Sequence, residues 1–76
     1  NTAVGFQSMN GGGNYINGSR NVAVGDSTLF LFASGNDNVA IGYKALSNAT
    51  NGSQSVAVGS RALRIYSGIY PNTAIG

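Results

Sequence analysis

A five-residue phrase recurs five times in this chain and constrains its fold more than any other feature. The phrase reads Asn or Ser, Val or Thr, Ala, Val or Ile, and Gly, and its copies begin at Asn1, Asn21, Asn38, Ser55 and Asn72. The closing glycines are separated by steps of 20, 17, 17 and 17 residues. A fixed period near this length is typical of a solenoid, in which each copy forms one coil and stacks on its neighbours.

The copies divide the chain into a single repeat array. We expect four full copies at residues 1–20, 21–37, 38–54 and 55–71, and a partial fifth copy at 72–76. The chain opens on the first residue of one copy and closes five residues into another. We therefore expect the array to be a segment of a longer fibre.

The composition lacks the usual means of stabilising so short a chain. A domain of 76 residues buries only about 60% of the surface that its unfolded form exposes. Cysteine and histidine are absent and the only acidic residues are Asp26 and Asp37, so we expect no disulfide, no metal site and no cofactor. Oligomerisation is the remaining source of stability.

Each copy is expected to contain short strands. In the first copy, residues 2–4 alternate between two faces, and Gly5 allows a corner or bulge before a second short strand at 6–9. The second copy repeats this pattern, with a second strand at 27–29. Either this strand extends as far as Phe32, or the rings of Phe30 and Phe32 seal an interface. Glycine recurs too often for helices, since each glycine costs a helix about 1 kcal/mol. The sequence therefore predicts an all-β solenoid of parallel strands with a period of about 17 residues.

The strand positions define two faces. The second and fourth positions of each copy share one face, and the third position, on the other face, is always alanine. For the three inner copies these ladder residues are Val22, Ala23, Val24, Val39, Ala40, Ile41, Val56, Ala57 and Val58. We predict a packed apolar layer on the first face and a close approach of another backbone or packed layer on the second.

A thin coil has only one interior, so a second buried face requires a partner. We therefore expect the strand to face its own coil on one side and another subunit on the other. Replacing Ala40 by Leu is expected to overpack a tight interface and to disrupt assembly.

Two further ladders follow from the stacking of equivalent residues. One is apolar and comprises Met9, Leu29, Leu46 and Leu63. The other is polar and comprises Asn1, Asn21, Asn38, Ser55 and Asn72. Amides of the second ladder are expected to hydrogen-bond to one another along the stack.

The repeated phrase is followed by two variable residues, then by Ala or Ser, and then by Leu. This pattern resembles the head repeats of trimeric autotransporter adhesins. Similar repeats occur in phage tail fibres and other bacterial surface fibres, and the resemblance covers essentially the whole chain. It implies a left-handed parallel β-roll assembled as a homotrimer. It also implies a non-enzymatic role, as a rigid extracellular spacer on a cell surface or virion that contacts a host surface protein or glycan. The longer period and the aromatic connectors favour a phage or environmental bacterial fibre.

Enzymatic alternatives find little support in the residues. Hexapeptide acyltransferases share the unit of an apolar residue, glycine, two variable residues and a small residue, but this chain has one such unit per period and no histidine base. The only carboxylate pair, Asp26 and Asp37, falls at non-equivalent positions of the repeat. We therefore predict that the chain is not an enzyme.

Other binding functions remain open. Tyr15, Tyr66 and Tyr70 lie in the connectors, where their rings could contact a sugar, as in a carbohydrate-binding module. Packing of these rings between the connectors of neighbouring subunits is the favoured alternative. An ice-binding solenoid is less favoured, because Thr2 and Thr73 share a ladder that carries valine between them. The net charge of +2 is too small to indicate nucleic acid as a partner. No apolar run approaches the roughly 20 residues needed for direct membrane insertion.

Overall fold

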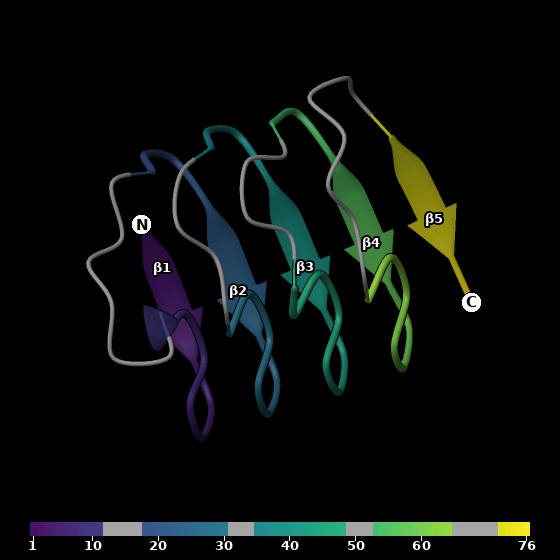
Figure 1. Ribbon diagram of the computed structural model, residues 1–76, viewed down its shortest axis with the longest axis horizontal. Coiled ribbons are helices and arrows are strands. Elements are labelled where there is room, and N and C mark those ends of the chain that lie inside the picture. The colour runs from purple at the N-terminus through teal and green to yellow at the C-terminus, as the bar shows by residue number, and fades with distance from the viewer. Residues whose placement is uncertain (12–17, 31–34, 49–52, 65–71) are drawn as a thin grey trace.

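The computed structural model describes residues 1–11, 18–30, 35–48, 53–64 and 72–76, and these segments form an all-β solenoid. Each strand contains three residues. The strands are β1 (Thr2–Val4), β2 (Val22–Val24), β3 (Val39–Ile41), β4 (Val56–Val58) and β5 (Thr73–Ile75). They form one parallel sheet in the order β1-β2-β3-β4-β5 (Figure 1). The predicted parallel solenoid is confirmed.

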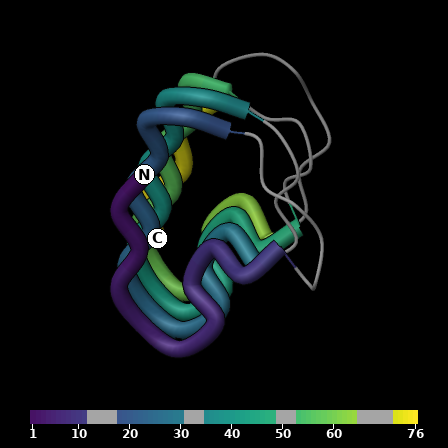
Figure 2. Tube along the Cα trace, turned by 90° about the vertical axis from the view of Figure 1, so that its left-hand side faces the viewer, coloured from purple at the N-terminus to yellow at the C-terminus, as the bar shows by residue number. Residues whose placement is uncertain are grey.

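The strands pair so that equivalent residues of successive copies lie side by side. Ala23 pairs with Ala40, and Ala40 pairs with Ala57. Figure 2 shows the consequence along the stack, where successive strands and successive turns lie over one another. The copies therefore build continuous ladders of like side chains, as the sequence predicts.

The segments that follow the glycines are turns, so the predicted second strands at 6–9 and 27–29 are wrong. Two residues of each turn have left-handed backbone conformations, as in Lys44 with φ of 58° and Leu46 with φ of 51°. A strand requires extended φ angles at successive residues, whereas this alternation coils the chain. The predicted extension to Phe32 lies partly outside the described residues, and Phe30, which is described, belongs to the turn.

Hydrogen bonds between coils hold these turns in place. The N–H of Lys44 donates to the carbonyl of Asp26 at 2.9 Å, and the N–H of Leu46 donates to the carbonyl of Ala62 at 3.0 Å. A left-handed conformation costs a non-glycine residue about 1 to 2 kcal/mol. Each turn therefore depends on its neighbour in the stack to retain this conformation.

The core lies between the strands and the turns of the same coils. Ala23, Ala40 and Ala57 are completely buried there, in a cluster that also contains Leu29 and Leu46. Met9 and Leu63 pack against this cluster, which confirms the predicted apolar ladder. The tight contact at Ala40 is thus within the coil, and the prediction that Ala40→Leu acts on an interface between subunits must be corrected. Small alanine side chains are needed because each coil is thin and a leucine fills its other side.

The glycines after the strands occupy a second tight position. Gly42 has φ of +120°, which confirms the predicted corner and which side chains rarely tolerate. A Cβ added to Gly42 would lie 2.7 Å from the carbonyl oxygen of Gly59 in the next coil. Stacking of the coils therefore requires glycine here for space as well as for conformation.

Candidate functional site

The outward face of the sheet is the candidate interaction surface. Its central side chains are the predicted ladder residues Val22, Val24, Val39, Ile41, Val56 and Val58. Val24 is 36% exposed and Ile41 is 40% exposed, although both are large and apolar. The remaining four are half-buried. Burial of an apolar side chain stabilises by about 1.5 to 3 kcal/mol, so an uncovered row of this kind favours association with another surface.

The structure separates the nine predicted ladder residues into two groups. The alanines Ala23, Ala40 and Ala57 point into the core, and the valines and isoleucine point outward. The sequence expectation of one face toward the coil and one toward a partner is compatible with this arrangement. The structure assigns the inward face to the alanines.

A buried polar ladder borders the start of the strands. The side-chain Oδ1 of Asn21 accepts hydrogen bonds from the backbone N–H and from Nδ2 of Asn38, each at 3.0 Å. The Oδ1 of Asn38 accepts from the N–H of Ser55 at 2.9 Å. Asn1 and Asn21 repeat the arrangement at one end of the stack. The predicted bonding between equivalent amides is confirmed, and it links each coil to the next.

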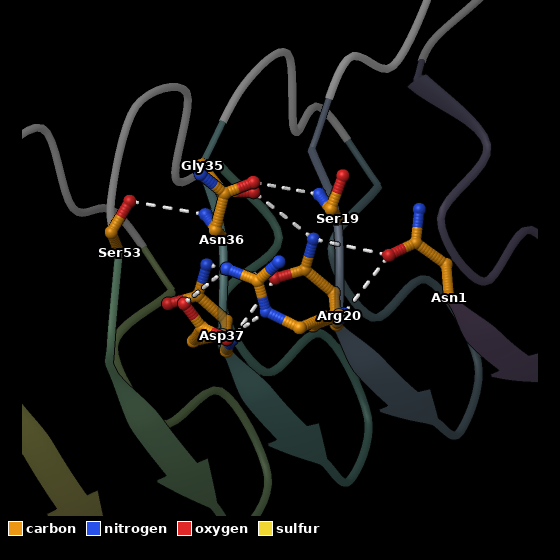
Figure 3. A network of polar contacts seen from close by, with 9 residues as sticks. Asn1, Ser19, Arg20, Gly35, Asn36, Asp37 and Ser53 are labelled. Atoms are coloured by element: carbon orange, nitrogen blue, oxygen red, sulfur yellow. Dashed lines mark hydrogen bonds and ion pairs between the residues drawn. The ribbon is translucent and has the colours of Figure 1, made fainter.

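Next to this ladder, polar contacts also join the segments that precede the strands (Figure 3). The N–H of Ser19 donates to Oδ1 of Asn36 at 2.8 Å, and the N–H of Asn36 donates to Oγ of Ser53 at 3.0 Å. Beside them, the guanidinium of Arg20 donates to both carboxylate oxygens of Asp37, at 2.6 and 3.0 Å. Sequence reasoning missed this ion pair, although Arg20 and Asp37 both directly precede the asparagine that opens a copy.

We predict that the pKa of the Asp37 carboxyl group is lower than that of an ordinary aspartate side chain, which is about 3.9. The hydrogen bonds from Arg20 lower the pKa of the Asp37 carboxyl group. Because this pKa is lowered in the folded state, the stabilisation is present above the pKa of the unfolded chain and is lost as pH falls through the folded value. Carboxyl carbon chemical shifts followed against pH will measure it.

The variant Arg20→Gln is expected to return the pKa of Asp37 toward its ordinary value. Arg61→Gln removes the same charge without touching Asp37 and is the matched control. An Asp37 titration that is identical in Arg20→Gln and in the wild-type chain would contradict the role of the ion pair.

The aromatic candidates Tyr15, Tyr66 and Tyr70 lie outside the described residues. Within the described ranges, no cluster of three or more His, Cys, Asp or Glu side chains could hold a metal ion. The described part of the chain also contains no helix of sufficient length and apolar character to span a membrane.

Comparison with protein-family models, with curated proteins and with solved structures finds no match to this chain.

Proposed function

We propose that the chain is a non-enzymatic segment of a structural and adhesive fibre, and that three copies pack together through the outward faces of their sheets. The fibre is a left-handed β-roll with a 17-residue repeat. It acts on a cell surface or virion as a rigid spacer that presents its connectors to a host protein or glycan. The observation that carries the proposal is the row of outward valine and isoleucine side chains along the stacked strands.

Two features of the solenoid support a spacer role. Successive coils are joined by strand pairing, by the asparagine ladder and by bonds between turns, so that the stack resists bending. In the described segments, every buried side-chain nitrogen or oxygen has a hydrogen-bond partner. The resemblance of the repeated phrase to adhesin head repeats points to the same assembly.

The variant Ile41→Asp tests the proposed assembly. In the trimer it would bury an unpaired carboxylate at each of the equivalent contacts, and such burial is strongly unfavourable. We expect the wild-type chain to sediment as a trimer and Ile41→Asp to lose the trimer at the same concentration. Analytical ultracentrifugation and native mass spectrometry will give the mass.

Ser60→Asp provides a control with the same added charge. Ser60 is exposed on a turn, and Asp26 occupies the equivalent position two copies earlier, so the coil already accommodates aspartate there. We expect this variant to remain trimeric. A wild-type chain that stays monomeric across the concentration range, or an Ile41→Asp variant that stays trimeric, would refute the proposed packing.

A further inference from the structure

A pocket of about 270 Å³ lies on the turns of the solenoid, away from the outward strand residues. Its lining includes Gln7, Phe30, Lys44, Ser47, Asn48 and Arg64. These residues come from all four full copies of the repeat, so that stacking of the coils brings them together. Its volume is just below the range of about 300 to 1,000 Å³ typical of small-molecule sites. The pocket therefore suits a ligand with about one ring.

The net positive charge of the protein is concentrated on these turns. Arg20 and Asp37 neutralise each other in the only ion pair of the described residues. All other charged side chains, Lys44, Arg61, Arg64 and Asp26, belong to the turn segments, and three cations against one anion leave +2.

Two of these cations line the pocket, and neither forms an ion pair within the described ranges. Lys44 places its ammonium 5.1 Å from the ring centroid of Tyr43. The carboxylate of Asp26 instead accepts a hydrogen bond from the hydroxyl of Ser27 at 2.6 Å. Both cations line the pocket and no acidic residue is among its described lining residues, so the pocket attracts anionic groups.

The neutral lining narrows the class of ligand. Gln7 and Asn48 carry side-chain amides that can both donate and accept hydrogen bonds, as sugar hydroxyls require. The half-buried Phe30 provides an apolar surface for the C–H face of a pyranose ring. We propose that this pocket binds one acidic sugar unit, a pyranose bearing a carboxylate or a sulfate group. The proposal does not depend on the proposed assembly.

Titration of the ¹⁵N-labelled 76-residue chain at low ionic strength will test the proposal. The probes are glucuronate, glucose 6-sulfate, glucose, inorganic sulfate and a DNA dinucleotide, and the readout is the amide shifts of Lys44, Asn48 and Arg64. We expect at least one acidic sugar to bind about tenfold more tightly than glucose, because a charge-assisted hydrogen bond contributes enough free energy for such a factor. We also expect it to bind more tightly than inorganic sulfate, which lacks the ring and the hydroxyl groups that Phe30, Gln7 and Asn48 would contact. The two acidic sugars distinguish a carboxylate ligand from a sulfate ligand.

Lys44→Gln and Arg64→Gln are each expected to weaken binding of that sugar about tenfold. The fold should tolerate Lys44→Gln, because Gln7 occupies the equivalent position of the first copy with a similar φ of 56°. Arg61→Gln is the control, since it removes a cation of the same turns that does not line the pocket. Its affinity is expected to stay within about twofold of the wild-type value. Phe30→Leu should weaken sugar binding without affecting inorganic sulfate.

Several outcomes would overturn the proposal. Equal affinity for inorganic sulfate and for the acidic sugars would indicate a site for simple anions. An equal loss in Arg61→Gln and Lys44→Gln would indicate a diffuse basic surface instead of a pocket. Tighter binding of a DNA dinucleotide than of either acidic sugar would assign the pocket to nucleic acid. The absence of any amide shift with either acidic sugar would also refute the proposal. Unchanged thermal unfolding of each variant will show that the fold is retained.

Discussion

Replacing Gly42 by alanine is expected to lower the free energy of unfolding by about 3 kcal/mol, because two costs combine at this residue. A side chain at φ of +120° is strained by about 1 to 3 kcal/mol. The added Cβ would also lie 2.7 Å from the oxygen and 2.8 Å from the carbon of the Gly59 carbonyl. The coils must separate to relieve this contact, which weakens the strand pairing and the asparagine ladder between them. Thermal unfolding followed by circular dichroism will measure the loss.

The glycine ladder supplies its own controls. Gly76 has nearly the same φ, +123°, but a Cβ added there meets nothing within 4 Å. Gly25 is intermediate, with its nearest contacts at 3.0 Å. We expect the loss of stability to decrease from Gly42→Ala to Gly25→Ala to Gly76→Ala. Equal stability of Gly42→Ala and Gly76→Ala would show that contact between coils is not the reason for glycine.

The variant Ala40→Leu is expected to destabilise each coil from within. Ala40 is completely buried in the cluster with Leu29 and Leu46. It pairs with Ala23 in one adjacent coil and with Ala57 in the other. Overpacking of this kind costs about 1 to 3 kcal/mol. In a domain of this size each 1 kcal/mol lowers the melting temperature by roughly 4 to 8 °C.

Sedimentation and circular dichroism together distinguish this effect from a defect of assembly. We expect Ala40→Leu to lower the melting temperature by the same amount at every protein concentration. Ile41→Leu, on the outward face of the same strand, is the control, because it conserves volume and is expected to keep the fold. A well-folded monomer of Ala40→Leu would instead mean that the alanine lies at a contact between subunits.

The repeated phrase was sufficient to predict the parallel register and both confirmed ladders. Once the copies stack, equivalent residues must lie beside one another, so the amides of Asn21 and Asn38 meet and the leucines Leu29 and Leu46 share one core. The same reasoning could have identified the ion pair of Arg20 and Asp37, whose positions in the repeat are equivalent. The pocket was beyond sequence reasoning, because its lining residues occupy different positions of the repeat.

The sequence alone therefore determined the stacking of the copies, since a period repeated in constant register leaves parallel ladders as the simplest way to bury its apolar residues. Only the tertiary structure decided which strand face lies inside. The pattern Val-Ala-Val has apolar residues on both faces, and hydrophobicity alone does not distinguish them. The thinness of the coil distinguishes the two faces, because alanine fits opposite leucine inside the coil and valine does not. The tertiary structure also decided that the residues that follow each glycine form a turn. Lys44 and Leu46 have no intrinsic preference for left-handed conformations, and hydrogen bonds with neighbouring coils hold them in these conformations.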